Sequence, residues 1–217
     1  MFIDAPTDTI TVYPFTRTAD PDLVAAIAAH PVALIGDVVA RMGLMSSAIA
    51  LRTSHRGLHG TVLPVHTREG DNLAIHRALD EARPGDVLVV NAAEETNRAV
   101  FGDILGEACL ARGITGVIVD GAIRDVDELD RLHLPVYSRA ISPAGPAKAG
   151  PGTVGLPIAC GGIVCHPGDA VFGDRDGIIT LRPDTLAAVT EGLIHQQAAE
   201  EAMRDRIRRT DSAPALD

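Results

Sequence analysis

The stretch GVIVDGAIRD, residues 116–125, decides the fold prediction because it joins a strand-like apolar run to a charged pair. Continuous apolar residues are typical of a strand that is covered on both faces, and VLVVN at residues 87–91 has the same character. The segment 103–113 between them has the start and the Gly stop of a helix. Strand, helix and strand in this order predict a parallel sheet with a right-handed crossover.

Further elements follow from spacing and from Gly and Pro. Helices are predicted over 23–31 and 34–43, ended by Pro31 and Gly43, and over the helically spaced segment 70–83. A strand is predicted at 60–67, an irregular loop at 142–155, hairpin strands within 156–183 and a long helix over 184–209. We therefore expect one α/β domain over residues 1–209, with a mixed sheet or two stacked sheets, and a disordered tail at 210–217.

Composition excludes several classes of function. The net charge is −10 and the longest basic block is RDRIRR at 204–209, which disfavours binding to the phosphate backbone of nucleic acid. The first residues lack the basic and apolar runs of a signal peptide, and no stretch has the length of a membrane span. The three cysteines fit reduced thiols. We therefore expect a cytoplasmic protein that binds neither nucleic acid nor membrane.

Two strand-to-helix junctions predict a ligand site. Gly102 and Asp103 stand at the start of the helix before 116–125, and Arg124 and Asp125 follow that strand. In open α/β sheets, ligands bind in the crevice beyond the carboxyl ends of adjacent strands. The helix N-terminus offers the amides of Ile104 and Leu105 to a carboxylate, and Gly102 leaves room for the ligand to approach.

The charged residues allow a metal-assisted chemistry. Asp125 is a hard oxygen ligand suited to Mg²⁺ or Mn²⁺, which often takes one or two carboxylates and completes its shell with water and substrate. Arg124 could stabilise an oxyanion, and Asp103 could orient or deprotonate a water molecule. Taken alone, each residue is better explained without a function: Asp103 as a helix cap, Arg124–Asp125 as a surface ion pair and Glu107 as a helix-dipole carboxylate.

Three segments resemble the RraA-like superfamily (regulator of ribonuclease activity A). They are PGDVLVVN, GDILGEACLARGITGVIVDGAIRDVDEL and GLPIACGGIVCHPGDAVFGDRDGIITL. The class II pyruvate aldolase branch, which cleaves 4-hydroxy-4-methyl-2-oxoglutarate and 4-carboxy-4-hydroxy-2-oxoadipate, carries an Asp, twenty residues, Arg-Asp, two residues and an acid. This chain is similar to that branch, with Asp103, twenty residues, Arg124-Asp125 and then Glu128.

The resemblance implies an activity and roles for the matching residues. Asp125 would bind the divalent metal, Arg124 would stabilise the enolate or polarise the 4-hydroxyl, and Asp103 would position the water that shuttles the proton. A 4-hydroxy-2-oxo diacid would yield pyruvate and a second oxo acid, with oxaloacetate decarboxylation as a side activity. The alternatives are a lyase for a different 2-oxo acid and a protein-binding regulator of a ribonuclease.

The resemblance also implies a three-layer β-β-α fold of the swivelling phosphohistidine-domain type and a homo-oligomer, either a trimer or a hexamer. A glutamate from a neighbouring subunit would complete the site, and the sequence leaves Glu191, Glu200 and Glu201 as alternatives. Four histidines precede the site: His55, His59, His66 and His76. His76 could line it, but a lone His on a helix is more often structural. A zinc site at Cys160, Cys165 and His166 is disfavoured because the spacing is loose and a fourth ligand is not obvious.

Overall fold

The computed structural model describes residues 8–54 and 57–211 and has one large mixed sheet at its centre. The central strands are β3 (Leu58–Thr67), β4 (Asp86–Asn91), β6 (Gly116–Ile123) and β7 (Val136–Ile141), which are parallel neighbours in this order. The parallel pair β4–β6 confirms the arrangement predicted from the two apolar runs. All eight residues of β6 are buried, as expected for a strand covered on both faces.

Shorter strands extend the sheet. On one side β8 (Gly152–Val154) pairs with β3, and β1 (Ile10–Val12) pairs with β8. At the far edge β2 (Ala50–Leu51) pairs with β7. The hairpin β11 (Ala170–Gly173) and β12 (Ile178–Leu181) attaches to the first half of β3, and β5 (Ala99–Phe101) attaches to the end of β6. The result is a mixed α/β fold.

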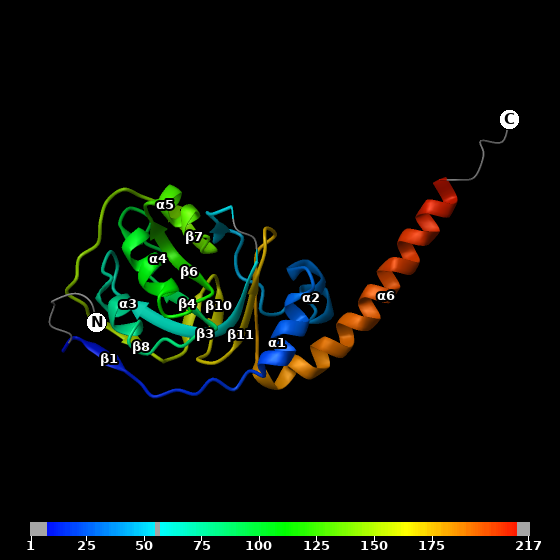
Figure 1. Ribbon diagram of the computed structural model, residues 1–217, viewed down its shortest axis with the longest axis horizontal. Coiled ribbons are helices and arrows are strands. Elements are labelled where there is room, and N and C mark those ends of the chain that lie inside the picture. The colour runs from blue at the N-terminus through cyan, green and yellow to red at the C-terminus, as the bar shows by residue number, and fades with distance from the viewer. Residues whose placement is uncertain (1–7, 55–56, 212–217) are drawn as a thin grey trace.

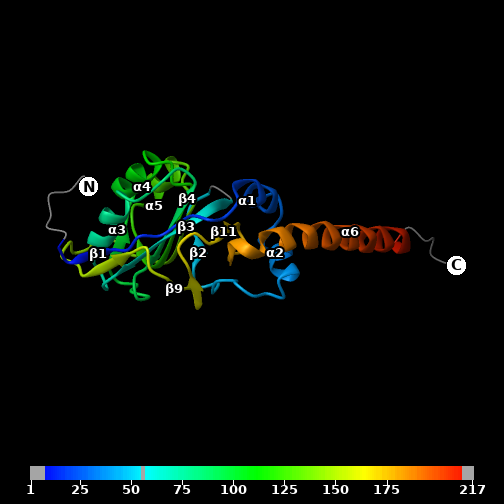
Figure 2. The same ribbon diagram turned by 90° about the horizontal axis from the view of Figure 1, so that it is seen from below.

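The two faces of the sheet carry different cover. Helices α3 (Leu73–Ala78), α4 (Asp103–Leu110) and α5 (Val126–Arg131) lie over one face, and the hairpin β9 (Ile158–Cys160) and β10 (Ile163–Cys165) lies under the other (Figure 2). Alternate residues of β6 divide between two cores accordingly. Val117 and Val119 pack on the helix side, whereas Ile118 packs on the hairpin side.

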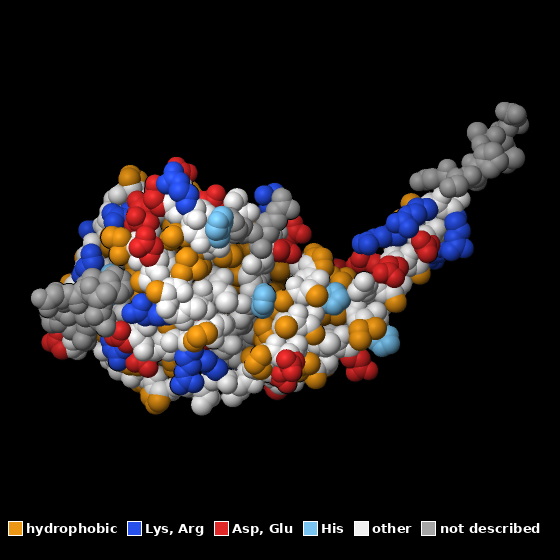
Figure 3. Space-filling view, in the orientation of Figure 1, with side chains coloured by type: hydrophobic (Ala, Val, Ile, Leu, Met, Phe, Trp, Pro, Cys, Tyr) orange, Lys and Arg blue, Asp and Glu red, His pale blue; other side chains and the backbone are white. Residues whose placement is uncertain are grey.

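A third core joins the remaining helices to the β11–β12 hairpin. Helices α1 (Pro21–Ala28) and α2 (Val32–Val38) pack on the first half of α6 (Leu186–Asp211), which follows a 3-10 turn, η1 (Pro183–Thr185). The second half of α6 projects away from the body (Figure 1), and its side chains are largely charged (Figure 3). Within residues 8–54 and 57–211 no single helix meets the length and hydropathy of a membrane span, although α1 and α2 together do so across a 112° bend.

Several boundaries differ from the sequence predictions. Helix α2 ends at Val38 and not near Gly43, because Ala40 and Arg41 adopt left-handed backbone angles. Helix α3 has only six residues, since the chain turns after Ala78. Strand β8 formed in a segment predicted as loop, and β5 formed just before the helix predicted from Asp103, where no element was predicted. The predicted tail beyond residue 211 lies outside the described residues.

Candidate active site

The two predicted junctions meet at the end of β6. Strand β5 runs parallel to β6 with Phe101 beside Ile123, so the residues that follow each strand are neighbours. The backbone N–H of Arg124 donates to the carbonyl of Phe101 at 3.0 Å. Gly102, which follows β5, is therefore held against Arg124 and Asp125, which follow β6.

Gly102 allows this contact through its small size. A Cβ atom added there would lie 2.5 Å from Oδ2 of Asp125 and 3.1 Å from Cγ of Arg124. Its φ of −160° is extended backbone that any residue adopts, so the conformation does not require glycine. Because Gly102 has no side chain, Arg124 and Asp125 can lie directly against the start of α4.

A cavity of about 290 Å³ opens beside this contact. Its walls come from α3, β5, the start of α4, the end of β6 and the loop between β7 and β8. The polar and charged lining residues are Asn72, His76, Asp103, Arg124 and Lys148. The predicted site residues Gly102, Asp103, Ile104, Leu105 and Arg124 also line it. Asp125 is not a lining residue, but it forms an ion pair with Arg124, which is.

The start of α4 differs in one detail from the prediction. Gly102 is the N-cap residue and Asp103 is the first helical residue, so Asp103 is not the cap. Its Oδ1 accepts a hydrogen bond from the N–H of Ile104 at 2.7 Å. The N–H of Leu105 is among the first-turn amides that have no intrahelical acceptor. The Leu105 amide is therefore without an acceptor inside the helix, whereas the Ile104 amide is occupied by the Asp103 side chain.

Arg124 and Asp125 form an ion pair with 3.2 Å between Nε and Oδ2. Their side chains are 39% and 34% exposed, so both groups remain accessible to water and ligand. Asp125 has φ of 56° in the left-handed region, which costs roughly 1 to 2 kcal/mol for a non-glycine residue. Beyond the ion pair, Nη1 of Arg124 lies close to Gly145, where an added Cβ would be 2.9 Å away. The guanidinium is thus confined between Gly102 and Gly145.

The opposite wall contains residues that sequence reasoning mostly missed. Asn72 and His76 come from α3 and its N-cap, and Pro146 and Lys148 come from the loop between β7 and β8. His76 is 3% exposed, and burial, followed by the positive charge of Lys148, lowers its pKa to about 4. His76 is therefore neutral near pH 7, and the basic charges of the lining are those of Arg124 and Lys148.

The other candidates lie away from the cavity. His59 and His66 are exposed on other parts of β3, and His55 lies outside the described residues. Glu107 is exposed in the second turn of α4, and Glu128 accepts a hydrogen bond from Arg131 at 2.9 Å. None of the three glutamates on α6 lines the cavity of the same chain; these are Glu191, Glu200 and Glu201.

The cysteines are buried thiols. Burial raises the pKa of Cys109 and of Cys165 to about 12 and raises that of Cys160 as well. All three are free cysteines.

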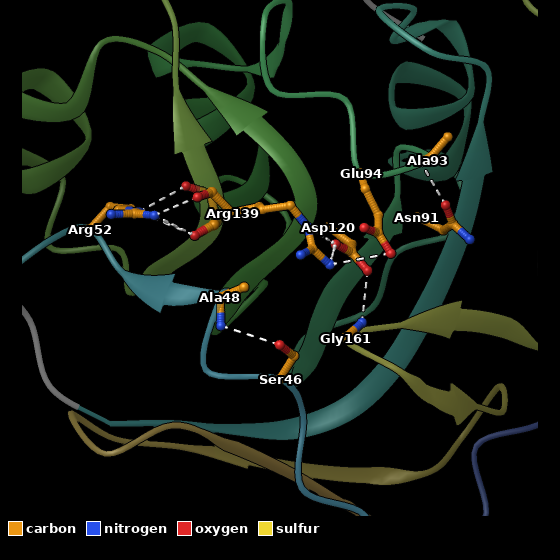
Figure 4. Close-up of polar contacts among 10 residues, drawn as sticks. Ser46, Ala48, Arg52, Asn91, Ala93, Glu94, Asp120, Arg139 and Gly161 are labelled. Carbon is orange, nitrogen blue, oxygen red and sulfur yellow. Dashed lines mark hydrogen bonds and ion pairs between the residues drawn. The ribbon is translucent and has the colours of Figure 1, made fainter.

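Asp120 points to the face of the sheet opposite the helices. One carboxylate oxygen accepts from Nε and Nη2 of Arg139 at 2.7 and 2.6 Å, and the other accepts from the N–H of Gly161 at 2.7 Å (Figure 4). Glu94 lies 3.5 Å from the same guanidinium. These bonds neutralise a buried carboxylate and attach the β9–β10 hairpin to β6, which is a structural role.

Mg²⁺ binds to carboxylate and other oxygen ligands, of which the site offers few. Throughout the described part of the chain, no group of three or more His, Cys, Asp or Glu side chains is arranged to hold a metal. Asp125 supplies one accessible carboxylate, which packs directly against the backbone of Gly102. One carboxylate fits a hard ion that keeps most of its water and takes further oxygens from a substrate.

Known proteins similar to the chain fall into two groups. A family model described as RraA-like, Aldolase/RraA, matches residues 22–180. A protein of Halalkalibacterium halodurans, provisionally named a 4-hydroxy-4-methyl-2-oxoglutarate aldolase, is 33% identical over 85% of this chain and 88% of its own.

Solved structures include two inhibitor proteins. Streptomyces coelicolor RraAS2, described as an unusual member of the RNase ES inhibitor RraA family, has a TM-score of 0.79 at 25% identity. The match covers 88% of this chain and 99% of that one. The RNA-processing inhibitor RraA from Thermus thermophilis has a TM-score of 0.66 at 25% identity, over 70% and 93% of the two chains.

Proposed function

The chain belongs to the RraA-like family, and we propose that it is a divalent-metal-dependent lyase. Its substrate would be a 4-hydroxy-2-oxo diacid, cleaved to pyruvate and a second oxo acid, with oxaloacetate decarboxylation as a side activity. The observation that carries the proposal is the contact of Gly102 with Arg124 and Asp125 at the mouth of a cavity that the start of α4 also lines. An aldolase name on a relative that is 33% identical supports the same reaction class.

Substrate binding follows from the helix terminus. The 2-oxo acid carboxylate would accept a hydrogen bond from the Leu105 N–H, where the dipole of α4 favours negative charge. Rotation of the Asp103 side chain would release the Ile104 N–H for a second bond. This places the keto carbon toward Arg124, which lines the same cavity.

Cleavage breaks the C3–C4 bond and leaves its electron pair on C3 as an enolate. The proton of the 4-hydroxyl is removed as C4 becomes a carbonyl, and a proton returns to C3 to give pyruvate. Arg124 cannot lose its own proton, so it stabilises the negative charge of the enolate oxygen throughout. Asp103 would hold the water molecule that carries the proton.

Asp125 would hold Mg²⁺ or Mn²⁺. When bound, the ion supplies Lewis-acid charge to the carboxylate and keto oxygens of the substrate. In oxaloacetate the bond that breaks is also C3–C4, with CO₂ as the leaving product and the same enolate remaining. One set of residues therefore serves both reactions.

The proposal extends to assembly, location and fold type. We propose a homo-oligomer, a trimer or a hexamer, and the projecting α6 supports it because Ile194, Met203 and Ile207 are more than half exposed there. A cytoplasmic location is supported by three free buried thiols. The assignment to a three-layer swivelling fold is supported by helices on one face of the sheet and a hairpin on the other.

A pyruvate-release assay tests the reaction. Purified protein is given 4-hydroxy-4-methyl-2-oxoglutarate or oxaloacetate with Mg²⁺, with Mn²⁺ or with EDTA. We expect turnover that EDTA abolishes and that Asp125→Asn removes. Asp127→Asn is the matched control, because this exposed carboxylate begins α5 two residues away. Full turnover in EDTA, or an active Asp125→Asn variant, would exclude the proposed chemistry.

A second candidate is a protein-binding regulator of a ribonuclease, which the two structural neighbours described as inhibitors favour. Such a function does not need Asp125, so inhibition by wild type and by Asp125→Asn would be equal. A lyase for a different 2-oxo acid remains the third candidate, and it would release pyruvate or a homologous oxo acid from a substrate outside the two tested.

A further inference from the structure

Lys148 is the only lysine in a chain that has eighteen arginines, and it lines the cavity on the wall opposite Arg124. We propose that Lys148 and Asn72 bind the second carboxylate of the substrate, so that the site selects 2-oxo acids with two carboxylates. The inference rests on the proposed function, because it concerns the far end of the substrate held at α4. The inference assigns the contact with the far end of the substrate, which the sequence analysis did not assign, to two residues of the same chain.

The backbone on both sides of Lys148 is fixed. Ala147 donates to the carbonyl of Gly70 at 2.8 Å and accepts from the N–H of Asn72 at 3.1 Å. On the other side, the N–H groups of Ala149 and Gly150 donate to Oδ2 of Asp71 at 2.7 and 3.0 Å. Lys148 therefore stands on a clamped loop and not on a mobile one.

Asp71 is the centre of this clamp. Its carboxylate is fully buried, and its Oδ1 accepts from the N–H of Leu73 at 2.9 Å, which attaches the start of α3 to the same group. One buried carboxylate thus orders the loop of Lys148 and the start of the helix that carries His76. A buried carboxylate is costly unless it is paired and hydrogen-bonded, so the bonds to Asp71 oppose any opening of the wall.

The ammonium of Lys148 has no carboxylate within ion-pair distance among residues 8–54 and 57–211. His76 on α3 adds no charge beside Lys148, because burial and the charge of Lys148 lower its pKa and keep it neutral near pH 7. The side chain of Lys148 is exposed to the cavity and to solvent. A ligand carboxylate would be its first close anionic partner in this part of the chain.

Asn72 gives an independent sign of a ligand. It is 5% exposed and lines the cavity, and its Oδ1 is buried without a hydrogen-bond partner among the described residues. Buried polar atoms are normally satisfied, so an orphaned one on a cavity wall indicates a missing partner. The Nδ2 of the same amide is not among these buried atoms, and it can donate to a carboxylate in the cavity.

The two walls suit the two ends of one diacid. The Leu105 amide and Arg124 lie on the side of α4 and β6, whereas Asn72 and Lys148 lie on the side of α3 and the β7–β8 loop. Gly145, three residues before Lys148, links them, since a Cβ added there would lie 2.9 Å from Nη1 of Arg124. A 2-oxo acid bound at α4 therefore extends its far end toward Lys148.

A matched pair of ligands that cannot be cleaved tests the assignment. 2-Oxoglutarate and 2-oxopentanoate have the same chain length, lack the 4-hydroxyl and differ in the second carboxylate. Isothermal titration with Mg²⁺ present should show that the wild-type protein binds 2-oxoglutarate about ten- to hundredfold more tightly, the range of a charged hydrogen bond. Lys148→Met should lose most of this preference and keep only the part that Asn72 contributes, and Lys148→Arg should restore most of the difference.

Asn72→Ala should lower the affinity for 2-oxoglutarate and leave that for 2-oxopentanoate unchanged. Equal binding of both ligands by the wild type, or an undiminished preference in Lys148→Met, would overturn the inference while leaving the lyase proposal standing. Failure of the wild type to bind either ligand would instead contradict the α4 site itself. The two proposals therefore fail in distinguishable ways.

A covalent role for the single lysine gives a different result. If Lys148 formed an imine with the keto carbon, borohydride reduction in the presence of pyruvate would leave a stable adduct that peptide mapping places at Lys148. We expect no adduct there, because the inference assigns Lys148 to the carboxylate and not to the keto group. An adduct at Lys148 would overturn it.

Discussion

Gly102→Ala tests the contact on which the active site depends. The new Cβ would stand 2.5 Å from Oδ2 of Asp125 and 3.3 Å from Nε of Arg124. Ordinary van der Waals contact needs about 3.4 Å, so the Asp125 carboxylate must retreat by about 0.9 Å. A misplacement of about 1 Å can cost about a hundredfold in rate, and we expect kcat/KM for pyruvate release to fall by about that factor.

The same substitution should leave the fold nearly intact. Gly102 has extended backbone angles that alanine adopts, and the group it displaces is the flexible end of a one-third-exposed side chain. We expect a change in the free energy of unfolding of about 1 kcal/mol or less, measured by urea denaturation.

Gly36→Ala is the control for this prediction. Gly36 lies within α2, where an added Cβ would meet only the side chain of Leu44, at 3.3 Å. This variant should keep full activity. A folded Gly102→Ala protein with wild-type kcat/KM would refute the reasoning, because it would separate catalysis from the contact between the two loops.

Four further predictions concern the cavity. Arg124→Lys should lower kcat about a hundred- to a thousandfold in the pyruvate assay, because a lysine ammonium does not reproduce the forked guanidinium donors. Asp103→Asn should lower kcat by about a hundredfold with little change in KM, as expected for a group that handles a proton after binding. In the protein with no ligand bound, Asp71→Asn should increase amide hydrogen exchange at Ala149 and Gly150, and unchanged protection there would exclude the clamp. The pKa of His76 is about 4 in the folded protein, below its ordinary 6.5, so the unfolded state binds this proton first as the pH falls. Between pH 6.5 and 4 the wild type should therefore lose about 2 kcal/mol in the free energy of unfolding, measured by chemical denaturation. His76→Gln should lack that loss.

The central strands could be predicted because their residues carry the information locally. β4 and β6 are runs of apolar residues between turn signals. Such a run is enough to indicate a strand that is buried on both faces. α3 could not be predicted in length, since its helical spacing continues to Ala82 while the chain turns after Ala78 to reach β4. β8 was missed because Gly152 begins it within a run of Gly and Pro, and its pairing with β3 is a long-range contact.

Half of the candidate site could be predicted for a similar reason. Gly102, Asp103, Arg124 and Asp125 follow consecutive elements, so spacing alone brings them to one edge of the sheet. The wall that contains Lys148 could not be predicted, because its loop is held by a long-range hydrogen bond. Ala149 donates to the carboxylate of Asp71, 78 residues earlier in the chain. Of this wall the sequence analysis singled out His76 alone, and the single lysine among eighteen arginines was a further signal that it did not use.

A crystal structure with Mn²⁺ and pyruvate would test the central claim most directly, since the anomalous signal of manganese locates the ion without assumptions about the ligand. The account predicts the ion at the Asp125 carboxylate, the pyruvate carboxylate at the Leu105 amide and the keto oxygen facing Arg124. Manganese away from Asp125, or pyruvate outside the cavity between α3 and α4, would contradict it.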